Sequence, residues 1–374
     1  MKIDLIITEL AVGGAERCLT ELASGLANRG HQVRVLTLGP PPKPPQDLLW
    51  RRLLREKIPV WSAETTTLTL APLALNRLQR MLARQQPDLC QSFLFHANVL
   101  GTLAARMARV PICVAGMRVA QPRRFRLWLE KQALRRCDAV VCVSESVADF
   151  ARRHFAGIEP PLYVIPNGVD TGRFASTPPA RWGQYGIPSQ TQVIVFVGRL
   201  APQKGLERLF AAAGQLLARD RNRWLVLIGD GPLRPWCQQQ CDLLPQRRAL
   251  LLPWQADVAP YIKAATLIML TSDYEGMPNV ILEAMAAGRA VVSTKVEGVS
   301  ELLGSGAEGQ IVDHDCDSVV QATEALLSDP NRTESVGVAN AIRAESEFGI
   351  PRMIDRYERL YHELHAAGYS PTSP

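Results

Sequence analysis

The chain has 374 residues, of which 47% are hydrophobic and 21% charged, as expected of a globular protein longer than one typical domain. No apolar run approaches the roughly 18 to 20 residues that a membrane-spanning helix needs, and the N-terminus lacks the pattern of a secretory signal. We therefore expect two domains, no transmembrane helix and a cytoplasmic location. The eight cysteines are scattered, largely within apolar segments, which predicts reduced core residues.

The net charge of +6 is unevenly distributed. Residues 1–172 carry 23 Lys and Arg against 14 Asp and Glu, whereas residues 173–374 carry 19 against 22. A basic half suits anionic membrane lipids or phosphate-bearing acceptors, although a solvated basic surface gives the same count. Nucleic acid is not among the expected partners.

Strand-like apolar runs alternate with amphipathic helical runs from the start of the chain. Residues 3–8 predict a strand, 15–29 a helix and 33–37 a second strand, which is the βαβ pattern. Further strands are predicted at residues 88–93, 112–114, 139–143 and 163–165, with spacers long enough for parallel crossovers. Residues 1–172 are therefore predicted to form a doubly wound parallel sheet.

The pattern blurs through Ser176-Thr177-Pro178-Pro179, which predicts a linker, and then starts again. Strands are predicted at residues 193–197, 225–228, 250–252, 266–270 and 290–293, and helices at 318–327 and 351–365. The predicted fold class is α/β, with two Rossmann-like domains at 1–172 and 173–350 facing across a cleft. The segment 351–374 is expected to be a helix that packs back toward the N-terminal domain.

Two glycines follow the first predicted strand. Gly13 and Gly14 fall between that strand and the first helix, where backbone N–H groups can approach a phosphate or a sugar. The Gly-x-Gly-x-x-Gly pattern of dinucleotide-binding folds is missing, and no acidic residue ends the second strand to hold a ribose. Both absences argue against a nicotinamide or flavin cofactor in this half.

Two cations fall in one predicted loop of the second half. Arg199 follows the strand at 193–197, and Lys204 comes five residues later, before the next helix. Ligands of open α/β sheets bind beyond the carboxyl ends of the strands. A guanidinium and an ammonium in that position can stabilise the charge on a departing nucleoside diphosphate. Loop cations are often merely solvated, so it is their position that favours a function.

Two glutamates flank the start of a predicted helix. Glu275 lies in the loop after the strand at 266–270, Pro278 is placed as the first helical residue, and Glu283 lies among apolar neighbours. A carboxylate in such surroundings needs a partner, and a ribose diol offers it two donors, although a backbone or arginine partner would also serve. Glu275 can accept hydrogen bonds from sugar hydroxyls while the N–H groups of residues 277–280 point at the same ligand.

The spacing of Glu275 and Glu283 matches the E-x7-E motif of retaining glycosyltransferases, and the chain resembles glycosyltransferase family 4, whose fold is called GT-B. The resemblance runs nearly from end to end, and the order of its segments makes it specific. These segments are Gly13-Gly14-Ala15-Glu16, Ile165-Pro166-Asn167-Gly168-Val169-Asp170, Gly198-Arg199 with Lys204-Gly205, Gly229-Asp230-Gly231-Pro232, and Glu275 to Gly288.

The resemblance implies a role for each residue of these segments. Arg199 and Lys204 would hold the donor diphosphate, Glu283 the ribose and Glu275 the transferred sugar. Further donor contacts are expected from Gly13, Gly14, Gly276, Met277, Pro278 and Asn279. The implied reaction is transfer with retention that needs no metal ion and no cofactor, with the leaving phosphate assisting deprotonation of the acceptor.

The resemblance also implies the classes of substrate. The donor would be a hexose-type nucleotide sugar, with UDP favoured over GDP. The acceptor would be a hydroxyl of a glycan or a lipid-linked molecule, in the synthesis of cell-surface polysaccharide or glycolipid.

The chain departs from the family pattern at two places. Many relatives carry His-x-His after the fourth strand, where residues 91–96 of this chain read QSFLFH, so His96 is the candidate for the active-site histidine. Capping of the following helix is the alternative role for His96. Glu297 replaces the first glycine of a Gly-Gly-x-x-Glu stretch, so the local backbone is expected to differ there.

Asp313-His314-Asp315 has the form of the metal-binding Asp-x-Asp of the other glycosyltransferase fold, but it lies too late in the chain. We expect Asp315 or Asp317 to cap the helix that follows.

A basic and aromatic stretch lies in the half that binds the acceptor in this family. Residues 123–136 mix cations with Phe125, Trp128 and leucines at helical spacing, as a membrane-surface helix would. An ordinary helix packed on its own sheet is the alternative. We hypothesise a peripheral enzyme on the inner face of the cell membrane that acts on a lipid-linked acceptor.

Two other functions fit the same architecture. A sugar-nucleotide epimerase of GT-B fold also uses paired carboxylates, but it would not require both the Arg199–Lys204 and the Glu275–Glu283 pairs. A non-catalytic sugar-nucleotide binding protein would use the same pocket without turnover.

Overall fold

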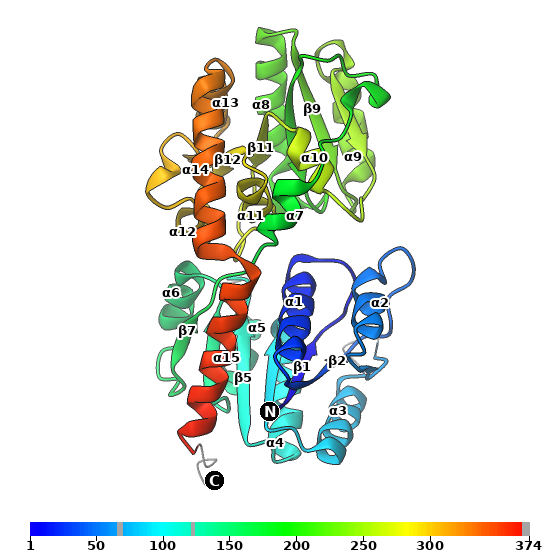
Figure 1. The fold of residues 1–374 in the computed structure, drawn as a ribbon, viewed down its shortest axis with the longest axis vertical. Helices are drawn as coiled ribbons and strands as arrows, with labels where there is room; N and C mark the ends of the chain where they lie inside the picture. The colour runs from blue at the N-terminus through cyan, green and yellow to red at the C-terminus, as the bar shows by residue number, and fades with distance from the viewer. Residues whose placement is uncertain (66–69, 121–123, 369–374) are drawn as a thin grey trace. The chain divides into compact units, whose positions relative to one another are not determined.

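A computed structural model of the chain describes residues 1–65, 70–120 and 124–368 (Figure 1). Arg123, the first residue of the predicted membrane-surface helix, lies outside the described residues. The chain divides into two compact units. Unit 1 comprises Met1–Gly168 and the segment from Ile350 onward, and unit 2 comprises Val169–Gly349. The chain therefore enters unit 2 once and returns to unit 1 once.

Unit 1 is built on a parallel sheet of seven strands in the order β3-β2-β1-β4-β5-β6-β7. The strands are β1 (Lys2–Ile7), β2 (Gln32–Thr37), β3 (Val60–Ser62), β4 (Leu89–Phe93), β5 (Ile112–Met117), β6 (Ala139–Cys142) and β7 (Leu162–Val164). The helices are α1 (Gly14–Asn28), α2 (Leu48–Arg55), α3 (Ala71–Gln85), α4 (Phe95–Met107), α5 (Arg124–Leu134), α6 (Glu145–His154) and α15 (Ile350–Ala366). The strand order reverses direction between β1 and β4, whose residues Ile7 and Phe93 are paired.

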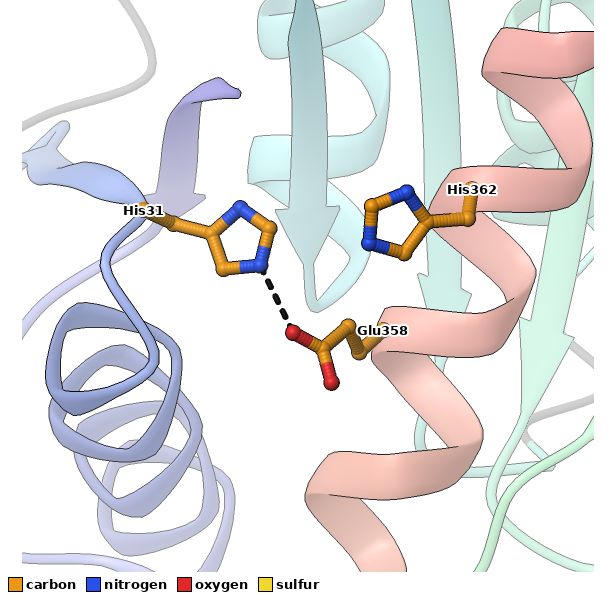
Figure 2. A group of neighbouring side chains, drawn as sticks. All are labelled: His31, Glu358 and His362. Atoms are coloured by element: carbon orange, nitrogen blue, oxygen red, sulfur yellow. Dashed lines mark hydrogen bonds and ion pairs between the residues drawn. The ribbon is translucent and has the colours of Figure 1, made fainter.

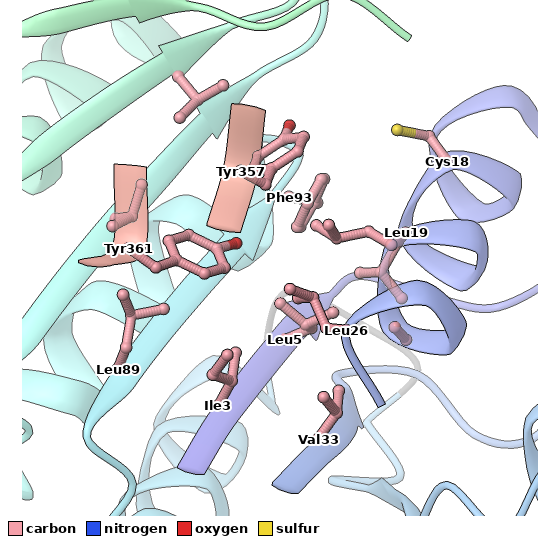
Figure 3. Close-up of a cluster of buried hydrophobic side chains, with 14 of the residues drawn as sticks. Ile3, Leu5, Cys18, Leu19, Leu26, Val33, Leu89, Phe93, Tyr357 and Tyr361 are labelled. Carbon is pink, nitrogen blue, oxygen red and sulfur yellow. The ribbon is translucent and has the colours of Figure 1, made fainter. Parts of the chain in front are cut away.

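Successive strand residues point to opposite sides of the sheet, and the residues on both sides are apolar. Helices therefore cover both faces of this sheet. Ile3, Leu5 and Ile7 of β1 are buried in the cluster formed with α1 and α15. Figure 3 shows Ile3 and Leu5 within this cluster. Ile6, between them, is buried in a second cluster with α3 and α4. The first half thus has the doubly wound arrangement that its alternating apolar pattern predicts.

Helix α15 belongs to the core of unit 1 although it ends the described chain. Tyr357 and Tyr361 on this helix are fully buried against the α1 side of the sheet (Figure 3). The Tyr361 hydroxyl donates to Gln91 Oε1 of β4 at 2.7 Å, so the one polar atom of that ring is satisfied. Helix α15 therefore completes the core of the unit to which the first 168 residues belong.

Unit 2 repeats the architecture with a parallel sheet of six strands in the order β10-β9-β8-β11-β12-β13. The strands are β8 (Gln192–Val197), β9 (Arg223–Ile228), β10 (Ala249–Leu252), β11 (Leu267–Leu270), β12 (Ala290–Thr294) and β13 (Ile311–Val312). The helices are α7 (Thr171–Ser176), α8 (Leu206–Arg219), α9 (Arg234–Leu243), α10 (Ala259–Ala264), α11 (Asn279–Ala286), α12 (Val299–Leu303), α13 (Cys316–Leu327) and α14 (Pro330–Phe348). Here the order reverses between β8 and β11, where Ile194 pairs with Leu267.

The strands predicted from apolar runs are all present, and the strands that were not predicted lie at the edges of the two sheets. The sequence did not predict β3 or β13, which are edge strands of three and two residues. It also did not predict α14, although Asp329 caps that helix by accepting a hydrogen bond from the Arg332 N–H. The buried face of α14 consists mostly of small or polar residues, so it lacks the apolar period on which the prediction depends.

The cysteines of the chain are free, and seven of the eight are buried, as the sequence predicted. Within the described ranges, no helix is long and apolar enough to cross a bilayer.

Candidate active site

The predicted site residues follow the strands at which each sheet reverses its order. Ligands of open parallel sheets bind beyond the carboxyl ends of such strands, because the connecting loops there diverge. In unit 1, Gly13 and Gly14 follow β1 and His96 follows β4. In unit 2, Lys204 follows β8 and Glu275 follows β11. Each unit therefore has candidate residues at its own switch point.

Lys204 and Glu275 form an ion pair in unit 2. The Lys204 Nζ lies 2.6 Å from Glu275 Oε1, and both side chains are largely buried, with 16% and 11% of their surface exposed. The Ser272 hydroxyl donates to the same carboxylate oxygen at 2.7 Å. Glu275 Oε1 thus accepts two hydrogen bonds, and the charges of the two side chains compensate each other.

Several further contacts hold the β8 loop against the β11 loop. The Thr271 hydroxyl donates to the backbone carbonyl of Lys204 at 3.0 Å, and the Gln203 side-chain amide donates to the carbonyl of Tyr274 at 2.8 Å. The backbone between the two loops is close: a Cβ on Gly205, which has φ +57°, would lie 2.0 Å from the Thr271 oxygen. A glycine is therefore required at position 205, and the Lys204–Glu275 pair sits on a fixed backbone.

The loop after β12 (residues 295–298) contacts the Glu275 loop from another side. The Glu275 N–H donates to Glu297 Oε2 at 2.9 Å. Next to it, Gly298 has φ +79°, and a Cβ there would lie 2.7 Å from the Gly276 carbonyl oxygen. The substitution of glycine by Glu297 thus adds a carboxylate that binds the backbone of the candidate sugar-binding residue. Neither Ser272 nor Glu297 was predicted as a partner of Glu275.

Helix α11 begins one residue later than the sequence predicted. Pro278 is the N-cap and not the first helical residue, because its backbone is extended, with φ −74° and ψ 109°. The first turn closes through the Ile281 N–H, which donates to the Pro278 carbonyl at 3.0 Å. Met277 and Pro278 are buried, and Asn279 is half-buried as the first residue of the helix. Glu283 is the fifth residue of α11 and is partly exposed beside buried apolar neighbours.

Arg199 lies two residues after β8, and its side chain is exposed. Arg199 and Lys204 belong to one loop, as predicted, but only Lys204 is drawn into the contact with Glu275. An exposed guanidinium at this edge of the sheet remains accessible to an anionic ligand.

In unit 1 the two glycines form the start of helix α1. Gly13 is the N-cap, in extended backbone, and Gly14 is the first helical residue. A Cβ on Gly13 would lie 2.3 Å from Glu16 Oε2, so the Glu16 carboxylate occupies the space beside this turn. Burial raises the pKa of Glu16 to about 7, and Glu9 adds to the rise, while a backbone hydrogen bond and Arg118 oppose it.

His96 is the second residue of α4, inside the first turn, and the N-cap of that helix is Leu94. The imidazole is half-buried and packs edge-on against the Phe95 ring, with 5.1 Å between the ring centroids. Burial lowers its pKa, and the nearby Arg126 guanidinium lowers it further, so the neutral form of His96 prevails at pH 7. A neutral imidazole at this edge can donate to or accept from a hydroxyl group.

The predicted site residues therefore fall into two sets, one in each unit. Gly13, Gly14 and His96 lie at the switch point of unit 1, and Arg199, Lys204, Glu275 and residues 276–283 lie at that of unit 2. Asp315, which was predicted to be a helix cap, is the N-cap of α13 and accepts from the Ser318 N–H at 2.7 Å.

Comparison with known families places both sets in matched segments. A family model described as Glycosyltransferase Family 4 matches residues 12–173. A second, described as Glycosyl transferases group 1, matches residues 191–329. The two matches together span most of the chain and include every candidate residue named above.

Curated proteins that are similar to this chain include a sugar-phosphate synthase and two proteins named as glycosyltransferases. The chain is 29% identical to the alpha-maltose-1-phosphate synthase of Mycolicibacterium smegmatis, over 64% of this chain and 66% of that protein, just under two thirds of its length. It is 27% identical to the UDP-Gal:alpha-D-GlcNAc-diphosphoundecaprenol alpha-1,3-galactosyltransferase of Escherichia coli, over 78% of this chain and 79% of that protein. It is 26% identical to the phosphatidyl-myo-inositol mannosyltransferase of Mycolicibacterium smegmatis, over 95% and 92% of the two chains.

The fold is shared with solved structures. The Anabaena protein Alr3699/HepE, in complex with UDP-glucose, superposes with a TM-score of 0.85 at 22% identity, over 97% of this chain and 100% of that one.

Proposed function

Since the chain belongs to the glycosyltransferases of family 4, with the GT-B fold, we propose that it transfers a hexose-type sugar with retention from a UDP-sugar to a hydroxyl of a glycan or lipid-linked acceptor. Membership of this family makes the chain an enzyme and a transferase, and so favours that function over the epimerase and binding-protein alternatives.

The observation that carries the proposal is the Lys204–Glu275 pair at the switch point of unit 2. We assign Lys204 and the exposed Arg199 to the donor diphosphate, Glu275 to the hydroxyls of the transferred sugar and Glu283 to the ribose. Gly276, Met277, Pro278 and Asn279 are assigned to the donor as well, through the start of α11. In unit 1, Gly13, Gly14 and His96 are assigned to contacts with the donor and its reacting sugar.

The proposed chemistry depends on stabilisation of the leaving group. As the glycosidic bond breaks, negative charge develops on the departing diphosphate, and the two cations stabilise it more in the transition state than in the bound donor. When the diphosphate takes over the Lys204 ammonium, the Glu275 carboxylate is freed to accept hydrogen bonds from the sugar. The leaving phosphate then accepts the proton of the acceptor hydroxyl on the face from which it departs, which gives retention without an enzyme nucleophile.

We further propose that this transfer needs neither a metal ion nor a cofactor. Arg199 and Lys204 supply the positive charge that a divalent ion would otherwise supply at a diphosphate. The proposal predicts that the rate of sugar transfer is the same in EDTA and in Mg²⁺.

The relatives support the choice of UDP and of the acceptor class. A galactosyltransferase named for UDP-Gal and a diphosphoundecaprenol-linked acceptor aligns with 78% of the chain, and a mannosyltransferase named for phosphatidyl-myo-inositol aligns with 95%. HepE has been solved with UDP and with UDP-glucose. These names support a UDP-sugar donor and an acceptor used in cell-surface polysaccharide or glycolipid synthesis.

A lipid-linked acceptor fits a peripheral location on the inner face of the cell membrane, which we propose for this chain. Helix α5 exposes Phe125 and Trp128 to the extent of 74% and 58%, and their rings stack with centroids 6.4 Å apart. Arg124 beside them is exposed too. An exposed aromatic pair with adjacent cations is suited to the interface of an anionic bilayer.

A donor screen tests the proposed function. The purified chain is incubated with radiolabelled UDP- and GDP-sugars and a membrane extract as the source of acceptor, and transferred label and released nucleotide are measured. We expect label in a lipid or glycan product and an equal amount of UDP. Epimerised UDP-sugar formed without acceptor would identify an epimerase, and UDP binding without turnover of any donor would identify a binding protein.

A further inference from the structure

Three side chains of types that commonly bind metal ions lie close together in unit 1, near the N-terminal ends of the sheet strands. His31 directly precedes β2, and Glu358 and His362 lie on α15 (Figure 2). One ligand atom from each of the three residues lies within 4.8 Å of the other two. The residues assigned to the donor in unit 1 follow the opposite, carboxyl ends of the strands, so this cluster takes no part in the proposed transfer.

The positions of the three side chains are set by their elements. Glu358 and His362 are four residues apart on α15, which places them on one face of the helix. The His31 ring is 7% exposed, and its Nε2 lies 2.8 Å from Glu358 Oε1. The His362 ring lies beside it, with 5.8 Å between the ring centroids (Figure 2). Two imidazoles and one carboxylate oxygen thus converge on a small volume.

Contacts on the far side of Glu358 and of His31 fix the orientation of these two ligands. The second oxygen of Glu358 accepts from Arg29 Nη1 at 2.6 Å, and Asp355 contributes a second carboxylate to the same guanidinium. The second ring nitrogen of His31 lies 3.4 Å from the Met1 amino nitrogen. Ligands of bound metals are held in this way by outer partners, with the remaining nitrogen or oxygen directed at the ion.

We propose that His31, Glu358 and His362 form a binding site for one divalent transition-metal ion of the zinc class. Two imidazoles and a carboxylate suit Zn²⁺, Co²⁺ or Ni²⁺ and disfavour Mg²⁺ and Ca²⁺, which take oxygen ligands. Ligands about 2.0–2.2 Å from a tetrahedral ion are roughly 3.4 Å apart. The three ligand atoms lie within 4.8 Å of one another, so small shifts of the side chains bring them to this spacing, and water completes the coordination.

The bound ion links two segments that are distant in sequence. His31 and Glu358 are 327 residues apart, and α15 is the helix by which the chain returns to unit 1. The same helix places Tyr357 and Tyr361 in the core. An ion that binds the folded unit and not the unfolded chain raises its stability by mass action. The bound ion therefore cross-links α15 to the residue that precedes β2.

Titration of the full chain without a histidine tag tests the site. The protein is treated with EDTA, exchanged into chelator-free buffer and titrated with Co²⁺ while its visible absorption is followed, and thermal unfolding is measured with and without Zn²⁺. We expect one equivalent of Co²⁺ with a visible band, and a rise in Tm of about 5 °C with Zn²⁺ but none with Mg²⁺.

Two variants and a matched control locate the ion. His362→Ala and Glu358→Gln should each weaken Co²⁺ binding at least about tenfold and abolish the Zn²⁺-dependent rise in Tm. His365→Ala, which removes another exposed histidine of α15, should bind as the wild type does. Circular dichroism in EDTA verifies that each variant is folded. The proposal is overturned if the wild type shows no stoichiometric band, or if folded His362→Ala binds as well as His365→Ala.

Discussion

The Lys204 ammonium contacts the Glu275 carboxylate at 2.6 Å, although the two residues are 71 positions apart in the chain. Lys204 follows β8 and Glu275 follows β11, and these strands are neighbours at the point where the sheet reverses its order. Each side chain therefore provides the charged partner for the other. A donor that brings a diphosphate and sugar hydroxyls can replace both halves of the contact at once.

Replacing Glu275 by Gln should separate turnover from nucleotide binding. The amide keeps the size of the side chain but loses the charge that pairs with Lys204 and that is assigned to the sugar hydroxyls. We expect kcat to fall by about 10²–10³-fold, and the Kd for UDP to change by less than about threefold, measured by radiolabel transfer and calorimetry. Glu207→Gln on the exposed face of α8 is the matched control. A wild-type rate in the Glu275 variant would contradict the assigned role.

Replacing Lys204 by Ala should have the complementary effect. The ammonium is assigned to the diphosphate, and a hydrogen bond to a charged group contributes about 1.5–3 kcal/mol. We expect the Kd for UDP to rise by about 10–100-fold, with less change in the Kd for uridine, which lacks phosphate. Arg221→Ala, at an exposed cation of the same unit just before β9, should leave both constants unchanged. An equal loss of uridine binding would show a general disruption of the site.

The sequence predicted where the residues of this site lie better than it predicted the contacts between them. The βαβ pattern and the positions of Arg199, Lys204 and Glu275 after strands were sufficient to predict where these residues lie. The pattern could not predict that Ser272 and Glu297 bind Glu275, because such contacts depend on loop backbone and side-chain rotamers. Pro278 differs by one residue because its ψ angle, and not its identity, decides where α11 begins.

Elsewhere, the predictions failed where the physical signal was weak. The face of α14 that is buried includes Gly337, Asn340 and Ala344, which give no apolar period. The His31–Glu358–His362 cluster could not be predicted because its members come from both ends of the chain, and only the return of α15 to unit 1 brings them together.

Glu297 offers a test of how the backbone of Glu275 is held. Its carboxylate accepts the Glu275 N–H at 2.9 Å, so its removal leaves that amide without its charged acceptor. We expect Glu297→Ala to raise the KM for the donor several-fold while kcat changes little, since the assigned groups all remain. Glu297→Gln, which retains an acceptor oxygen, should restore most of the lost affinity. Identical constants in Glu297→Ala and the wild type would show that the contact does not position Glu275.

Glu16 should make the stability of unit 1 depend on pH. Burial raises the pKa of this carboxyl from 4.5 to about 7 in the folded chain. Between these two values the folded state binds more protons than the unfolded state, so stability falls as pH rises from about 4.5 to 7. The difference between the two pKa values corresponds to roughly 3 kcal/mol.

Glu16→Gln removes this titration. The Tm of the variant should therefore fall less than the Tm of the wild type as the pH rises from 5 to 7.5. We expect a difference of about 5–10 °C at the upper pH, measured by thermal unfolding. Glu159→Gln, at an exposed glutamate of the same unit, should follow the wild-type curve. Parallel curves for Glu16→Gln and the wild type would mean that the carboxyl titrates normally.

The aromatic pair of α5 should mediate binding to anionic bilayers. Full burial of one large apolar side chain contributes about 1.5–3 kcal/mol, and the nearby cations add an attraction that salt screens. We expect the wild type to sediment with vesicles containing phosphatidylglycerol, more strongly at low salt, and the variant Phe125→Ser with Trp128→Ser to bind at least about tenfold more weakly.

Leu243→Ser provides the comparison, because Leu243 lies on α9 of unit 2 and is 77% exposed. A comparable loss in this variant would mean that any exposed apolar residue contributes, and failure of the wild type to bind these vesicles would exclude the proposed membrane location. If only the α5 variant loses binding while its turnover of a water-soluble acceptor is unchanged, the aromatic pair serves to bring the enzyme to a lipid-linked acceptor.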